Sequence, residues 1–145
     1  MGDDPMTFDL ERFVAAQRPA YDAVVTELRA GRKTGHWIWF IFPQVAGLGR
    51  SQMSQHYAIA SLDEARAYLA HPVLGARLHE CAALVLATGA RTAPDIFGEL
   101  DAMKVRSSMT LFHRAAPDDP VFRAVLERFY GGVADPATDA LIEAS

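Results

Sequence analysis

Apolar residues recur along most of the chain with the spacing of amphipathic helices. Between residues 19 and 30 one such stripe is formed by Tyr21, Val24, Val25 and Leu28. Similar stripes predict helices over residues 61–70, 74–89, 100–114 and 120–130, and shorter ones over 51–57 and 135–142. A separate helix starting near Phe8 is expected to end at Pro19, because proline disfavours helix at the preceding residue.

One stretch breaks this helical pattern. Six consecutive large apolar residues run from Trp37 to Phe42, with His36 before them and Gln44 just after Pro43. The run is too short for periodicity to separate a buried strand from a buried helical turn. Since the chain contains no other convincing strand, we expect an irregular or short helical segment that forms an aromatic wall of the core. Its polar ends are expected to open into a cleft.

These patterns together predict a mainly α fold. We expect a single compact domain of about six to eight helices over residues 7–145, preceded by a flexible tail at residues 1–6. The 145 residues suffice for one domain with a substantial core. The sequence shows no internal repeat and no linker long enough to separate two domains.

Composition narrows the class of protein. The net charge is −4, which argues against binding nucleic acid through overall charge. No apolar run approaches the length of a membrane span, and the acidic start is unlike a signal peptide. The single cysteine, Cys81, suits a reducing compartment, so a cytoplasmic location is expected. The histidines lack metal-ligand spacing, and neither a metal nor another cofactor is predicted.

Polar residues interrupt the apolar face of the helix predicted over residues 100–114. On a helical wheel, the apolar arc consists of Leu100, Met103, Val105, Met109, Leu111 and Phe112. Within that arc fall Asp101, Lys104, Ser107 and Ser108. One interpretation is a buried Asp101–Lys104 pair, with the serines bonded to the backbone one turn back. The other is a pocket opposite the aromatic wall, in which Lys104 and Ser108 hold a phosphate or carboxylate.

A second group of basic residues precedes the aromatic run. It consists of Arg29, Arg32, Lys33 and His36. These charges either offset the dipole at a helix C-terminus or form a rim that attracts an anionic ligand.

Several motifs, taken in order, resemble one bacterial family. They are Gly35–Gln44, Gly47–Gly49, Tyr57–Ile59, Tyr68-Leu69 with His71–Gly75, Ile96–Gly98, Lys104 and Ser107–Phe112. The family is domain of unknown function 1810, and the resemblance covers about residues 8–142. It implies a mainly helical domain and no established activity. Some members are labelled calpastatin, but that inhibitor works as a disordered chain, whereas this sequence predicts a compact core.

A likeness of architecture alone connects the chain to the YbiA/NADAR group, whose acid residues do not map onto this sequence. That group acts on N-glycosidic bonds of phosphorylated or ADP-ribosyl compounds. By this analogy the ligand would be a nucleotide or ribosyl phosphate that the protein either binds or hydrolyses.

The resulting function hypothesis assigns a role to each candidate residue. Trp37 or Trp39 would stack on a base, and Gln44 would stand at the mouth of the cleft. The charged part of the ligand would be held by Lys104, Ser107, Ser108 and either Arg32 or Lys33. His36 or Asp101 would transfer protons. The alternative is a non-enzymatic interaction module that contacts a protein partner, or a second copy of itself, through an exposed apolar patch.

Overall fold

The computed structural model describes residues 8–144, and it confirms the mainly α fold. Within these residues the helices are α1 (Glu11–Arg29), α2 (Ile38–Ile41), α3 (Gln52–His56), α4 (Leu62–Ala70), α5 (Leu74–Ala87), α6 (Ala93–Phe97), α7 (Glu99–Ala115), α8 (Pro120–Tyr130) and α9 (Pro136–Ala144). The described part thus has nine helices, because the aromatic run contains α2, and α6 lies between the helices predicted over residues 74–89 and 100–114. The expected tail at residues 1–6 lies outside the described residues.

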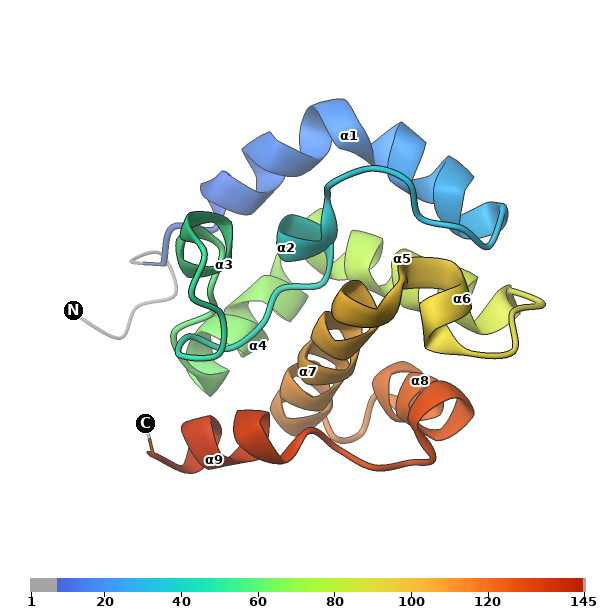
Figure 1. The fold of residues 1–145 in the computed structure, drawn as a ribbon. Coiled ribbons are helices and arrows are strands. Elements are labelled where there is room, and N and C mark those ends of the chain that lie inside the picture. Colours follow the sequence, from blue (N-terminus) through green and yellow to red (C-terminus); the bar gives the residue numbers. More distant parts are fainter. Residues whose placement is uncertain (1–7, 145) are drawn as a thin grey trace.

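The predicted break at Pro19 is wrong, since α1 continues through this proline. A proline inside a helix lacks the N–H that would bond one turn back, and it costs about 3 kcal/mol relative to alanine. Here Pro19 is exposed, while Phe13, Gln17 and Leu28 on both sides of it are buried. The buried face of α1 packs on α5, and this tertiary packing overrides the local preference. Figure 1 shows α1 as an arch over the rest of the molecule.

Aromatic rings connect the helices through the core. The ring of Phe13 in α1 meets Tyr68 in α4 edge-on at 5.1 Å, and Tyr68 meets Phe112 in α7 at 5.3 Å. Phe112 in turn lies 5.8 Å from Phe122 in α8. Cys81 of α5 is fully buried in the same core. These ring contacts place α7 at the centre of the core. The helix contacts α4, α6, α8 and α9 and lies in the middle of Figure 1.

Polar caps fix where the short helices begin. Ser51 and Ser61 each accept a hydrogen bond from the backbone N–H three residues later, at 3.1 Å. Ser61 and Glu64 have the spacing of a capping box, but the Glu64 carboxylate accepts from the N–H of Ala60 instead of that of Ser61, at 2.7 Å. Asp119 caps α8 by accepting from the N–H of Val121.

The aromatic run folds as one helical turn, α2, between α1 and α7. Of its residues only Trp39 is partly exposed. The chain then passes through Gln44 to a parallel bridge between Val45 and Ile59. In this bridge the Ile59 N–H donates to the carbonyl of Gln44, and the Ala46 N–H donates to that of Ile59, both at 2.8 Å. The bridge closes residues 46–58 into a loop and fixes Gln44 beside α7.

Candidate functional site

A single carboxylate determines the path of the chain from α1 into the aromatic segment. Glu27 accepts hydrogen bonds from the N–H groups of Thr34 (2.6 Å) and Gly35 (2.8 Å), and from Nε1 of Trp37 (3.0 Å). Burial acts to raise the pKa of Glu27, but these bonds outweigh it and leave the pKa below its ordinary value. The indole of Trp37 is therefore held inside the protein, where it is only 3% exposed. This leaves Trp39 as the tryptophan with a free edge.

The same segment brings Lys33 to the start of α7. Its ammonium lies 2.7 Å from Oδ2 of Asp101, while the ammonium of Lys104 lies 3.1 Å from Oδ1. The Asp101–Lys104 pair considered from the sequence is thus present, with Lys33 as a third member. Lys33 is almost enclosed, with a side chain 7% exposed, whereas that of Lys104 is 26% exposed. Two ammonium groups therefore share one carboxylate, and the more exposed of the two is Lys104.

Both lysines also lie over aromatic faces. The Lys33 ammonium is 5.1 Å from the ring centroid of Trp37, and that of Lys104 is 5.3 Å from that of Trp39. Such contacts stabilise a cation without neutralising its charge. The Nε1 group of Trp39 is buried and has no hydrogen-bond partner among the described residues.

Asp101 remains ionised at neutral pH in this arrangement. Partial burial acts to raise its pKa, but the hydrogen bonds and charges of Lys33 and Lys104 dominate and hold the pKa below its ordinary value. An ionised, doubly paired carboxylate suits a role in positioning the two lysines better than one as a proton donor.

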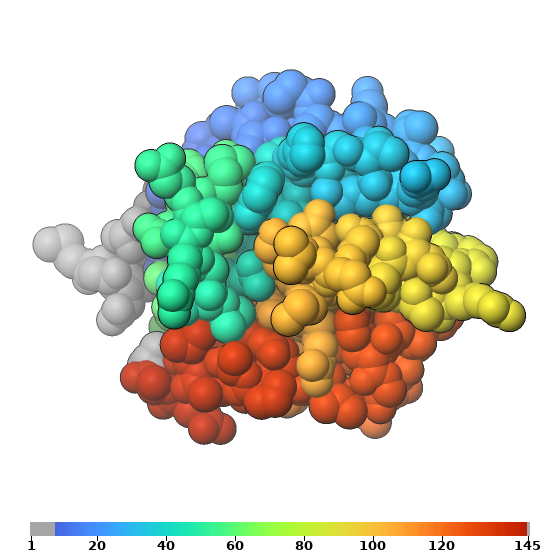
Figure 2. Space-filling view, viewed as in Figure 1, coloured from blue at the N-terminus to red at the C-terminus, as the bar shows by residue number. Residues whose placement is uncertain are grey.

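A groove of about 360 Å³ opens beside this cluster. It is lined by Gln44, Leu48, Gly49, Ser54, Leu100, Met103, Lys104, Arg106, Ser107, Asp135 and Ala137. These residues come from Gln44 just before the bridge, from the loop that the bridge closes and that includes α3, from α7 between Leu100 and Ser107, and from the start of α9. Figure 2 shows a hollow where these segments meet. The volume is at the small end of the range found for ligand pockets.

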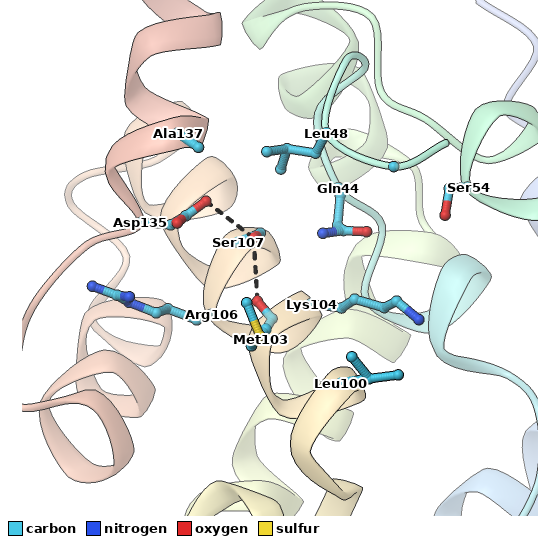
Figure 3. A pocket seen from close by; sticks show the side chains of 11 residues that line it. Gln44, Leu48, Ser54, Leu100, Met103, Lys104, Arg106, Ser107, Asp135 and Ala137 are labelled. Carbon is cyan, nitrogen blue, oxygen red and sulfur yellow. Dashed lines mark hydrogen bonds between the residues drawn. The ribbon is translucent and has the colours of Figure 1, made fainter. Parts of the chain in front are cut away.

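The polar residues of the groove fall into two groups at opposite ends (Figure 3). At one end are Lys104, Gln44 and Ser54, and at the other are Arg106, Ser107 and Asp135. Between them the walls are apolar and consist mainly of Leu48, Leu100 and Met103. The Gln44 amide has no hydrogen-bond partner among residues 8–144, so it is available to a ligand.

The second end is held rigidly. Oδ2 of Asp135 accepts from Ser107 Oγ (3.1 Å) and from both the N–H (3.1 Å) and the hydroxyl (2.6 Å) of Thr138. The Asp135 N–H donates to Thr110 Oγ1 at 2.9 Å. Arg106 donates from Nε and Nη2 to the carbonyls of residues 133 and 134, each at 3.0 Å. Within the described chain, Oδ1 of Asp135 and Nη1 of Arg106 are left without a partner.

The structure places the sequence-predicted residues in four groups. Gln44, Lys104 and Ser107 line the groove, and Lys33, Trp39 and Asp101 belong to the adjoining cluster. Arg32 and His36 are exposed and line none of the groove. The remaining two, Trp37 and Ser108, lie inside the protein.

The two serines of α7 differ. The single hydroxyl proton of Ser107 is shared between the carbonyl of Met103 one turn back (3.2 Å), as one interpretation of the sequence expected, and Oδ2 of Asp135 (3.1 Å). Ser108 is fully buried, and its hydroxyl has no partner within residues 8–144.

The prediction of a single apolar arc on α7 is wrong. Leu100 and Met103 are 75% and 67% exposed, whereas Val105, Met109 and Phe112 are buried. The helix has two apolar faces, since its first turns border the groove and its later turns enter the core. Ser107 continues the line of the exposed face.

Sequence reasoning missed the residues that other elements contribute. The sequence marks Asp135 only as the start of the last helix and Leu48 only as part of a family motif, and Arg106 carries no signal. Glu27 carried no signal beyond its place near the end of α1. Only contact in three dimensions reveals that these residues act on the same site.

None of the helices within residues 8–144 combines the length and hydropathy that a bilayer crossing needs. In the same residues no cluster of histidine, cysteine, aspartate or glutamate could hold a metal ion.

The fold and site together define an all-α protein with an open groove beside a cluster of two lysines and one aspartate. The chain belongs to the family described as protein of unknown function (DUF1810), which matches residues 7–142. This confirms the resemblance drawn from the motifs.

A solved structure supports the same assignment. The chain is similar to the crystal structure of the conserved hypothetical protein Rv1873 from Mycobacterium tuberculosis, with 53% sequence identity and a TM-score of 0.94. The similarity covers 96% of this chain and 99% of the other. No match was found among curated proteins.

Proposed function

We propose that the groove binds a small anionic metabolite of the nucleotide or ribosyl-phosphate type. The observation that carries this proposal is the position of Lys104, which lines the groove and shares the charge of Asp101 with Lys33. Because one carboxylate carries one negative charge, a bound anion would neutralise the remaining positive charge at Lys104. Such a ligand would be met in the cytoplasm, the compartment that the single cysteine favours.

The surroundings of Lys104 favour an anion over water as the missing partner. The apolar walls, formed by Leu48, Leu100 and Met103, exclude water from a bound ligand and so strengthen its attraction to an ammonium group. Gln44 adds an unpaired amide that can donate to the same anion. A few polar groups in a largely apolar groove are typical of small-molecule sites.

The proposal is for binding, and not for turnover. The two residues considered for proton transfer offer no acid and base pair in the groove, since Asp101 is ionised with a lowered pKa and His36 does not line it. Hydrolysis of an N-glycosidic bond would need an acid that protonates the leaving group, and neither Asp101 nor His36 provides one in the groove.

The first prediction concerns Lys104. Thermal unfolding should be measured with nucleoside monophosphates, ADP-ribose and ribose 5-phosphate, with the wild type and Lys104→Gln in parallel. A ligand at 100 times its dissociation constant adds about 2.7 kcal/mol of stability. We expect a rise in Tm for the wild type that is lost in Lys104→Gln, because the glutamine keeps most of the side-chain length but removes the charge.

Arg91→Gln serves as the control, since it removes one positive charge from an exposed loop residue away from the groove. This variant should respond to the ligands as the wild type does. An equal response from Lys104→Gln would contradict the proposal, as would a flat screen with the wild type.

A second candidate function, a protein interaction module, is favoured by the exposed apolar residues at the edge of the groove. Of the large hydrophobic residues exposed within 8–144, Leu100 and Met103 line the groove and Met53 precedes the lining residue Ser54. Exposed apolar groups gathered around one groove also suit a protein partner. A flat ligand screen would favour this interaction module.

A further inference from the structure

The two ends of the groove present different chemistry to a ligand. One end offers the Lys104 ammonium and the Gln44 amide, which suit a phosphate. The other offers a carboxylate oxygen of Asp135 that accepts hydrogen bonds and a nitrogen of Arg106 that donates them. A ligand that spans the groove therefore meets an anion site at one end and both an acceptor and a donor at the other.

The acceptor and the donor at the second end are preorganised. Four hydrogen bonds fix Asp135, through its backbone N–H and its Oδ2, and leave Oδ1 free. Two more fix Arg106 through Nε and Nη2 and leave Nη1 free. Groups held in this way lose little freedom when a ligand binds, so their hydrogen bonds contribute to selectivity.

The separation of the two ends suits an elongated ligand. Lys104 and Ser107 are three residues apart on α7, which is about 4.5 Å of helix rise. Figure 3 shows the Lys104 side chain extending away from Asp135, so the two charged groups are directed toward opposite ends of the groove. The apolar walls between them would contact the faces of a flat ring.

Resting on the proposed function, we infer that the groove selects nucleotides whose base carries an exocyclic amine next to an unprotonated ring nitrogen. Adenine and cytosine have such an edge: the amine would donate to Asp135, and the ring nitrogen would accept from Arg106. Hypoxanthine and uracil present a carbonyl and a ring N–H at the same positions. Their carbonyl would face the carboxylate of Asp135, and their N–H would face the guanidinium of Arg106.

The test uses two matched ligand pairs, AMP with IMP and CMP with UMP, titrated by isothermal calorimetry. In the wild type the amino base should bind about tenfold more tightly in each pair, the size of one favourable hydrogen bond against one unpaired group in an open groove. Ribose 5-phosphate, which has no base, should bind more weakly than AMP.

Two variants separate the two ends. Asp135→Asn should bring both affinity ratios close to one, because asparagine lacks the charge and has an amide N–H that can donate to the carbonyl of hypoxanthine or uracil. Asparagine caps a helix as well as aspartate does, so α9 should be retained, which circular dichroism verifies. Lys104→Gln should instead weaken all four nucleotides together and leave the ratios as in the wild type.

The outcomes distinguish this inference from the proposed function. Equal binding of AMP and IMP that still depends on Lys104 would overturn the base selection and keep the anion site. The same holds if ribose 5-phosphate binds as tightly as AMP, or if Asp135→Asn keeps the wild-type ratios. Absence of binding for all the phosphorylated ligands would overturn both.

Discussion

At the scale of single residues, Glu27 has the widest local effect. It joins α1 to the segment that contains both Lys33 and the aromatic run, through three hydrogen bonds to one carboxylate oxygen. Removing the carboxylate leaves the buried Nε1 of Trp37 unsatisfied and frees two backbone N–H groups. The position of the Lys33 ammonium beside Asp101 therefore depends on a residue that does not line the groove.

We predict that Glu27→Ala lowers the free energy of unfolding by about 2 kcal/mol, the cost of losing hydrogen bonds to a charged group. Urea denaturation at neutral pH measures this change. Glu11→Ala is the control, because Glu11 makes only an exposed ion pair with Arg18 at 3.8 Å, and its loss should cost less than about 1 kcal/mol. Equal effects of the two substitutions would show that Glu27 has no special role.

The difference in the free energy of unfolding between the wild type and Glu27→Ala should depend on pH, and the sign of this dependence follows from the pKa of Glu27. Because the pKa of Glu27 is lowered on folding from its ordinary value of 4.5, its stabilisation is fully present above that pH. It is lost as the pH falls through the folded-state value. The difference between wild type and Glu27→Ala should therefore be constant near neutrality and shrink at pH values below about 4.

At the scale of elements, the joint between α4 and α5 depends on the absence of one side chain. A Cβ atom at Gly75 would lie 2.1 Å from the carbonyl oxygen of Leu69, far closer than contact allows. The carbonyl oxygen belongs to the backbone and the Cβ atom is bonded directly to it, so neither atom can rotate away from the other. The tight turn through His71 thus requires glycine at the start of α5.

We predict that Gly75→Ala lowers the free energy of unfolding by about 1–3 kcal/mol, the usual cost of overpacking. Gly89→Ala is the matched control, because a Cβ there would meet nothing within 4 Å. That substitution should leave stability unchanged or raise it by about 0.4–1 kcal/mol, since it restricts the unfolded chain. Thermal unfolding of both variants beside the wild type measures the contrast.

Most elements could be predicted from the sequence because their signals are local. Ser51, Ser61 and Asp119 mark helix starts through bonds to N–H groups within three residues. Pro19 is also a local signal, and it predicts a helix end that does not occur, because the packing of α1 on α5 is not local and overrides it. A local pattern also could not divide the apolar residues of α7 between the core and the groove.

The candidate site was predictable only in part. Asp101 and Lys104 share one helix, so their pairing follows from spacing alone. The third member, Lys33, reaches Asp101 only because Glu27 turns the intervening chain. Asp135 and Arg106 belong to the groove through contacts between α7 and the start of α9, which no motif records.

At the scale of the whole molecule, the ring contacts connect the first and second halves of the chain. They join α1, α4, α7 and α8 into one core to which the aromatic segment also belongs. We propose, as the sequence led us to expect, that residues 7–145 form one cooperative domain.

The corresponding prediction is that urea unfolding is two-state. Tryptophan fluorescence reports on Trp37 and Trp39 in the first half of the chain, whereas far-ultraviolet circular dichroism reports on all helices. The two curves should have the same midpoint. A fluorescence transition at lower urea than the dichroism transition would mean that the first half unfolds separately.

The burial of Cys81 offers a practical means of observing the groove. Burial raises the pKa of this thiol to about 12, and it is the only cysteine in the chain. Thiol-directed dyes react with exposed thiolates, so the native protein should remain unlabelled under mild conditions. A cysteine introduced at the exposed rim position Met103 would then be the sole attachment point, and a dye placed there would report the arrival of a ligand without a background signal.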